Sequence, residues 1–280
     1  MIRMPRLPHP TPAELRRDPL PLRGRTALVT GASRRAGIGH AVARRLAAYG
    51  ASVYLHHHVP HDADQPWGAD RPEDVLASVR DALGDPGARV VAGPGDLADP
   101  AVPAELVARA ADALGGRLDI LVANHAQSGF DGTLDEIDAT MLDRHWAVDT
   151  RSVVLLIQAH ARLRPAGPGG RVVMMTSGQD IASGMPGEMA YALQKGALAS
   201  ITRSLSTALA EQGITVNTVN PGPVDTDYLT GADYEAVAAG FPSGRWGMPD
   251  DPARLIAWLA TDEAGWITGE VINSEGGFRR

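Results

Sequence analysis

The chain alternates short apolar runs with stretches in which apolar residues recur at helical spacing. Several of the runs, such as "LDILVAN" (118–124), are apolar throughout, which is typical of parallel strands covered on both faces. Between the runs, stretches such as 37–50 place Val42, Leu46 and Tyr49 on one helical face and end at Gly50. The predicted strands are residues 25–30, 51–56, 88–93, 118–124, 171–177, 214–220 and 268–274.

This alternation predicts an α/β fold, a single Rossmann-type doubly wound parallel sheet of about seven strands with helices on both faces. We expect one such domain over residues 23–280, after an extended proline-rich arm over residues 1–22. Residues 57–72 are rich in turn-forming and polar side chains and are expected to form an inserted loop. The glycine-containing segment 225–246 is expected to form a mobile substrate lid.

The composition excludes several classes of function. A formal net charge of −7 and scattered arginines argue against nucleic acid or an anionic membrane as a partner. The absence of cysteine excludes disulfides and thiolate chemistry, and no run approaches the ~18 apolar residues of a membrane span, so a cytoplasmic location is expected. Residues 56–58 and His61 are histidines, but adjacent strand residues face opposite sides, so no metal site is predicted.

Glycines and polar residues follow the predicted strands at one edge of the sheet. Gly31, Gly37 and Gly39 lie between the first strand and its helix, where glycines let backbone amides approach a pyrophosphate. Ligands of such sheets bind at the carboxyl ends of the strands. The other strands are followed there by Asp96, Asn124, Ser177 and Asn220. The pattern therefore predicts a dinucleotide site.

Seven motifs, in order, resemble those of the short-chain dehydrogenase/reductase family. They are "TGASRRAGIG" (30–39), "GDL" (95–97), "ANHA" (123–126), "MMTSG" (174–178), "YALQK" (191–195), "NPGPVDT" (220–226) and "WITGEVINSEGG" (266–277). The resemblance covers roughly residues 24–277 and is to 3-oxoacyl-carrier-protein reductase-like members, here with an extended glycine loop. It implies an NAD(P)-dependent oxidoreductase that interconverts a ketone and a secondary alcohol. Enoyl reductases usually separate the tyrosine and lysine by six residues, whereas here three residues separate Tyr191 from Lys195.

The resemblance also implies the catalytic residues. Tyr191 would be the acid/base, Lys195 would stabilise its phenolate and bind the nicotinamide ribose, and Ser177 would hydrogen-bond the substrate oxygen. Because Lys195 lies one helical turn from Tyr191, we expect it to lower the phenol's pKa. Asp149 replaces an asparagine that is usual in the family. Its charge is expected to keep Lys195 protonated and raise the pKa of the phenol slightly, which would slow the reaction or raise its pH optimum.

The cofactor contacts implied by the resemblance surround the same edge of the sheet. Asp96 and Leu97 would contact the adenine, and Asn124 and Ala126 the adenosine ribose. For Asp96 a role as cap of the following helix is an alternative, and both roles could hold. The glycine loop, the second strand and the segment after the sixth strand would contribute Gly31, Ser33, Arg34, Arg35, Gly37, Ile38, Gly39, His57, Pro221, Gly222, Val224 and Thr226, with the last four at the nicotinamide carboxamide.

Arg34 and Arg35 favour NADP(H) over NAD(H), because a guanidinium can bind the 2′-phosphate and no acid ends the second strand. Asp62 and Asp64 lie further along the chain, in a loop that could fold back to the ribose, so NAD(H) stays an alternative cofactor. A homo-oligomer, dimer or tetramer, is expected through the long helices after the fourth and fifth strands. Two other functions stay open on this fold: a non-redox enzyme of dehydratase or cyclase type, and a nucleotide-sensing binding protein.

Overall fold

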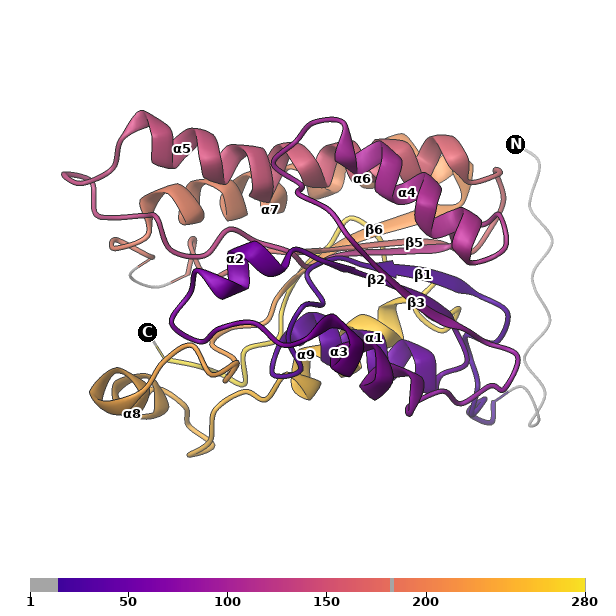
Figure 1. Ribbon diagram of the computed structural model, residues 1–280, viewed down its shortest axis with the longest axis horizontal. Coiled ribbons are helices and arrows are strands. Elements are labelled where there is room, and N and C mark those ends of the chain that lie inside the picture. Colours follow the sequence, from indigo (N-terminus) through magenta and orange to yellow (C-terminus); the bar gives the residue numbers. More distant parts are fainter. Residues whose placement is uncertain (1–14, 182–183, 280) are drawn as a thin grey trace, which may run out of the picture.

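The predicted sheet is confirmed. The computed structural model describes residues 15–181 and 184–279, and its seven strands form one sheet in the order β3-β2-β1-β4-β5-β6-β7. Every neighbouring pair of strands is parallel (Figure 1). The strands are β1 (Thr26–Val29), β2 (Ser52–His57), β3 (Val90–Pro94), β4 (Ile120–Ala123), β5 (Gly170–Met175), β6 (Ile214–Asn220) and β7 (Val271–Asn273).

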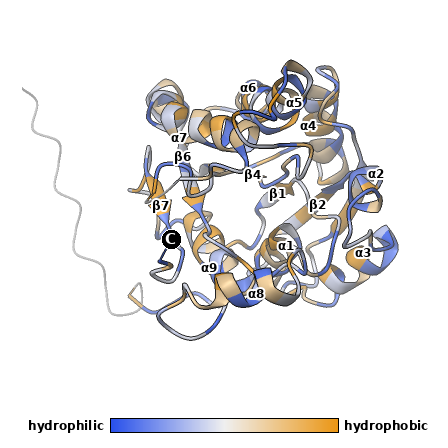
Figure 2. Cartoon of the chain, turned by 90° about the vertical axis from the view of Figure 1, so that its left-hand side faces the viewer, coloured by the Kyte–Doolittle hydropathy of each residue, from blue (hydrophilic) through white to orange (hydrophobic). Residues whose placement is uncertain are grey.

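Two helical layers sandwich the sheet (Figures 1 and 2). One contains α4 (Val102–Ala113), α6 (Ser152–Leu163) and α7 (Met189–Leu209), and the other contains α1 (Ile38–Ala48), α3 (Pro72–Arg80) and α9 (Asp250–Leu259). The remaining helical segments are α2 (Val59–Ala63), α5 (Ala139–His145), the π-helix η1 (Trp146–Arg151), the 3₁₀-helix η2 (Ala210–Gln212) and α8 (Gly231–Ala238). Among the described residues, no helix is both long and apolar enough to cross a bilayer.

The continuous apolar runs arise because each central strand contributes to two cores. In β4, Ile120 and Val122 pack into the core that also contains α1 and α9. Leu121 and Ala123 pack into the opposite core, beneath α4 and α6. A strand buried on both faces has no polar alternation.

The sequence predicted a loop over residues 57–72, but part of this segment is helical. It contains the one-turn helix α2, and its last residue, Pro72, begins α3. Pro60 and Pro72 lie in the first turns of these helices, where an unbonded backbone nitrogen is tolerated. Proline here starts helices instead of excluding them.

Residues 1–14 of the predicted N-terminal arm lie outside the described residues. Within the described part, Leu22 is fully buried, and its backbone N–H donates to the Tyr49 carbonyl at 2.9 Å. Leu22 belongs to the core shared with α1 and β2. The packed structure therefore begins before residue 23.

Leu22→Ala tests this boundary. We expect it to lower the free energy of unfolding by ~2–5 kcal/mol, the usual cost of emptying a buried leucine site. The matched control is Leu15→Ala, since Leu15 is 71% exposed. Urea denaturation followed by circular dichroism measures both. Equal midpoints for the two variants would show that Leu22 is not part of the folded core.

Candidate active site

The turn between β1 and α1 is pressed against the end of β4. Gly31 has a φ of +67°, and a Cβ at this position would lie 2.7 Å from the His125 Cα. A Cβ at Gly39 would lie 2.5 Å from the Gly31 carbonyl oxygen. The Asn124 side-chain amide donates to the Thr30 and Gly31 carbonyl oxygens, at 3.1 Å each. Glycine is required at both positions for this approach.

His56 holds the same turn from the other side. Its Nδ1 accepts from the Gly31 N–H at 3.3 Å, and its Nε2 lies 2.9 Å from the Gly95 carbonyl oxygen. Burial lowers the pKa of His56 to about 4. The ring is therefore neutral at physiological pH, with Nδ1 accepting and Nε2–H donating. In the sequence, His56 counts against a metal site and stands where an acid is absent from the end of the second strand; its contacts with the glycine loop were not predicted. No group of three or more potential metal ligands is present in the described parts of the chain.

The two loop arginines are both held by the inserted segment. The Arg34 guanidinium carbon lies 5.4 Å from the centre of the Trp67 ring, in a cation–π contact. Arg35 donates to the Asp70 carboxylate twice, from its backbone N–H at 2.7 Å and from Nη2 at 3.0 Å. Half of the Arg35 side chain (54%) stays exposed. The inserted segment thus fixes the loop without using all of the guanidinium donors.

Polar atoms without partners lie beside this loop. Among the described residues, His57 Nδ1 and Trp67 Nε1 are buried and unpaired. Such atoms are uncommon in proteins and suit a polar ligand. Ser33 Oγ accepts from the His58 N–H at 3.4 Å, and Ile38 packs against the core. Together with the glycine cradle, these groups fit the adenosine phosphate end of a dinucleotide.

The other predicted cofactor residues lie in the segments that follow β3, β4 and β6. Asp96 is exposed and accepts from the Ala98 N–H at 2.9 Å, in a turn that ends before α4 begins. It therefore caps a turn, and the alternative that it caps the helix is wrong. Leu97 and Val224 are buried. The remaining residues are partly exposed, and they are Asn124, Ala126, Pro221, Gly222 and Thr226.

The structure brings Ser177, Tyr191 and Lys195, three of the four predicted catalytic residues, together. Tyr191 and Lys195 lie in the first two turns of α7, and Ser177 follows β5. Ser177 hydrogen-bonds the Tyr191 phenol, and the Lys195 Nζ lies 5.2 Å from the centre of the phenol ring. Lys195 is 2% exposed. Its backbone carbonyl accepts from the Thr176 hydroxyl at 2.8 Å, which joins α7 to the end of β5.

The pKa of Tyr191 is raised, so the expected lowering is wrong. Burial is the main cause, and the carboxylates of Asp149 and Glu188 add to it, while the hydrogen bond from Ser177 acts in the opposite direction. Burial also lowers the pKa of Lys195, which the Asp149 carboxylate opposes. In this dry site, desolvation of the phenolate is the largest cause of the shift in the Tyr191 pKa.

Asp149 has a partner that the sequence analysis missed. It lies fully buried in the π-helical turn η1, and such turns are frequent at functional sites. Its Oδ1 accepts from the Gln127 N–H at 2.8 Å and lies 4.0 Å from the Lys195 Nζ. Its Oδ2 lies 2.8 Å from Nδ1 of His145. The four-residue spacing of His145 and Asp149, the same as that of Tyr191 and Lys195, was the available signal.

Asp131 is a second missed residue. Its carboxylate accepts from the backbone N–H groups of Ala190 and Tyr191, at 2.8 Å and 2.7 Å, and so binds the first turn of α7. The same carboxylate lies 3.9 Å from the His145 Nε2. Asp131 has no motif that marks it, because the two α7 amides that it binds lie about 60 residues away in the chain.

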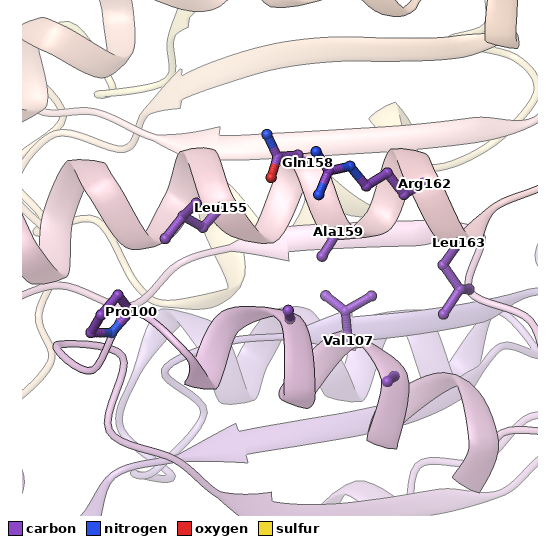
Figure 3. Close-up of a pocket in the computed structure, with 9 residues that line it drawn as sticks. Pro100, Val107, Leu155, Gln158, Ala159, Arg162 and Leu163 are labelled. Carbon is purple, nitrogen blue, oxygen red and sulfur yellow. The ribbon is translucent and has the colours of Figure 1, made fainter.

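Two cavities lie outside the catalytic trio. An apolar groove of about 350 Å³ lies along the junction of α4 and α6 and is lined by Val107, Leu155 and Leu163 (Figure 3). A larger, more polar cavity of about 610 Å³ lies between α1 and the segment after β6. Arg35 and Asp225 both line it, which places the start of the predicted lid beside the glycine loop.

Comparison with known proteins gives consistent matches along the chain. A family model described as "Enoyl-(Acyl carrier protein) reductase" matches residues 31–279. The uncharacterized oxidoreductase YjdA of Bacillus subtilis (strain 168) is 43% identical over 91% of this chain and 96% of its own length. The cis-4-hydroxycyclohexanecarboxylate dehydrogenase of Sinomonas cyclohexanicum is 36% identical over 91% of this chain and 96% of its own length.

A solved structure agrees with these sequence relatives. A short chain dehydrogenase from Burkholderia cenocepacia J2315, in complex with NADP, superposes with a TM-score of 0.80. It is 36% identical, over 91% of this chain and 98% of that one. The fold, the glycine cradle, the trio after β5 and these matches agree, and the chain belongs to the short-chain dehydrogenase/reductase family of oxidoreductases.

Proposed function

We propose that the protein interconverts a ketone and a secondary alcohol with a nicotinamide cofactor, as a carbonyl reductase or alcohol dehydrogenase. The observation that carries this proposal is the hydrogen-bonded Ser177–Tyr191 pair beside the buried Lys195. The relative from Sinomonas cyclohexanicum, a dehydrogenase of a hydroxycyclohexane carboxylate, supports alcohol chemistry. The four-residue spacing of Tyr191 and Lys195 favours it over the enoyl reduction in the family model's description.

Each residue of the trio has a distinct task in this proposal. The bound cofactor would supply or accept the hydride. The Tyr191 phenol would give its proton to the substrate oxygen in reduction and take it back in oxidation. Ser177 would donate to the same oxygen and stabilise its developing charge. Lys195 would stabilise the phenolate and hold the nicotinamide ribose. A raised phenol pKa keeps Tyr191 protonated, which suits reduction near neutral pH.

Tyr191→Phe tests this assignment. It should lower kcat by more than about 100-fold, the contribution of a positioned acid, while the dissociation constant of the cofactor stays nearly unchanged. Turnover is followed by the absorbance of the reduced nicotinamide with a panel of ketones, and binding by titration calorimetry. Lys195→Ala should both lower kcat and weaken cofactor binding. Tyr49→Phe, at the residue that follows α1, is the control for loss of a phenol.

Near-normal turnover by the Tyr191→Phe protein would overturn the mechanism. Cofactor binding with no oxidation or reduction of any ketone or alcohol would instead favour a nucleotide-sensing protein. Conversion of substrate without a change in the reduced-nicotinamide absorbance would favour a non-redox enzyme of dehydratase or cyclase type.

We further propose that NADP(H) is preferred over NAD(H). Trp67 and Asp70 hold Arg34 and Arg35 at the glycine loop, and Arg35 keeps unused donors for a 2′-phosphate. The end of β2 carries His56 and His57 in place of an acid. The neighbour from Burkholderia cenocepacia, solved with NADP, supports the same choice.

Arg34→Ala and Arg35→Ala test the preference. Each lost charge-assisted bond is worth roughly 1.5–3 kcal/mol, so each variant should weaken NADPH binding at least about tenfold and leave NADH binding unchanged. Arg203→Ala is the control, because Arg203 is 69% exposed and paired with Glu270 at 2.9 Å. The preference is wrong if NADH binds as tightly as NADPH, or if neither loop variant changes the ratio.

Residues 225–246 remain our proposed substrate lid. Helix α8 in this segment has no buried residue, so its packing is weak. The segment is closed on itself by stacking of Tyr234 on Trp246, whose ring centres lie 4.7 Å apart. A self-packed segment beside the glycine loop could move as one body.

We also propose a homo-oligomer, dimer or tetramer, built through the long helices. The apolar groove along α6 (Figure 3) and two exposed side chains, Leu193 and Trp146, support it. Light scattering at micromolar concentration should give a multiple of the 29.5 kDa chain mass, and a monomer would contradict the proposal. A cytoplasmic location is compatible with the lack of cysteine and stays a proposal.

A further inference from the structure

A buried carboxylate lies beside the proposed catalytic pair, where the family usually has a neutral asparagine. The Asp149 side chain is 0% exposed, and its Oδ1 lies 4.0 Å from the Lys195 Nζ. A buried charge is costly unless it is paired. Left alone, this one would oppose formation of the Tyr191 phenolate. The residue that pairs with Asp149 therefore determines how strongly its charge opposes formation of the Tyr191 phenolate.

His145 is placed to be that partner. Its side chain is 1% exposed, and its Nδ1 lies 2.8 Å from the Asp149 Oδ2, one helical turn away. Its Nε2 lies 3.2 Å from the Gly129 carbonyl oxygen and 3.9 Å from the Asp131 carboxylate. The Gly129 carbonyl only accepts, so Nε2 must carry a proton to bond it, while Asp149 needs a proton on Nδ1. Only the imidazolium has both protons.

The other charges around His145 support this state. Carboxylates approach it from two elements, Asp149 from η1 and Asp131 from the loop before α5, and Glu188 lies at the start of α7. The cations nearby are Lys195, which faces Asp149, and Arg144, which is turned toward Phe130. Burial works against a charge on His145, but Asp149 and Asp131 outweigh it, and the net pKa of His145 is raised.

We propose that His145 is the counterion of Asp149 and, through it, a positioning residue for Tyr191 and Lys195. As an imidazolium it cancels the Asp149 charge, so that the pair presents Lys195 with the neutral surroundings that an asparagine would provide. The role in turnover rests on the proposed function of Tyr191, whereas the charged state of His145 does not. The ring of His145 also meets the Tyr191 ring edge to face, with centres 6.3 Å apart, so the pair borders the phenol directly.

The test removes the imidazolium with and without the carboxylate. His145→Asn keeps a neutral donor for Asp149 but leaves its charge uncompensated. Alcohol oxidation near pH 7 should fall at least about fivefold, and the acidic limb of the pH–rate profile should move to higher pH, because the carboxylate opposes the phenolate. In the His145→Asn, Asp149→Asn double variant, the profile should return to the wild-type position. His160→Asn controls for the loss of a buried histidine and should not move the profile.

Two kinetic results would overturn the proposal. One is an unshifted pH profile for His145→Asn. The other is a double variant as impaired as His145→Asn, because a merely structural histidine would not be rescued by neutralising Asp149.

Imidazole ¹⁵N resonances test the pair without any turnover and without altering His145. In the wild-type protein both His145 nitrogens should stay protonated above pH 6.5, the ordinary histidine value, and Asp149→Asn should lower the pKa of His145. A neutral His145 at pH 6 would refute the counterion. If the resonances show the imidazolium while Tyr191→Phe keeps full turnover, the proposed function fails and the charge pair stands.

Discussion

The site depends on the close contact between the β1–α1 turn and the end of β4. The Asn124 amide joins the Thr30 and Gly31 carbonyls across it, and Gly39 leaves room for the approach. The contact continues through His125, whose Nδ1 lies 2.7 Å from the Thr30 hydroxyl and whose Nε2 lies 2.8 Å from the Ser152 hydroxyl at the start of α6. One chain of polar contacts therefore links the glycine cradle to the helix that follows Asp149. This places the dinucleotide cradle and the proposed acid/base pair at one edge of the sheet.

Burial has a larger effect on the pKa values of Tyr191 and Lys195 than their proximity to each other. Water is excluded from Lys195, Asp149 and His145, so each charge must be balanced by a neighbour. The Asp131 carboxylate is compensated partly by backbone groups. It accepts from two N–H groups in the first turn of α7 and also faces His145. The Tyr191 phenol thus lies on α7, whose first turn is bound by the Asp131 carboxylate. The Asp149 carboxylate lies beside Lys195 of the same helix. His145 and Lys195 are two cations that lie near these carboxylates.

The sequence predicted the sheet because several strands are buried on both faces and are apolar throughout, as in β4. It predicted the trio and the glycine cradle because these lie in short, ordered motifs. It could not predict contacts made across the fold. Trp67 and Asp70 meet the loop arginines from a segment with no periodicity, and Asp131 reaches α7 from a loop. The sign of the Tyr191 pKa shift was wrong because desolvation is a property of packing, which spacing does not reveal.

In the proposed reaction, hydride moves to a carbonyl carbon at this site while Tyr191 moves the proton. The most direct test of this reaction is turnover of cyclic ketones, including cyclohex-2-enone, with NADPH deuterated at the transferring C4 position. Mass spectrometry and NMR of the products locate the label. We predict one deuterium on the carbinol carbon of the alcohol, with the carbon–carbon double bond of the enone intact. Deuterium at the β-carbon of a saturated ketone, or a cofactor that keeps its label with every ketone, would contradict it.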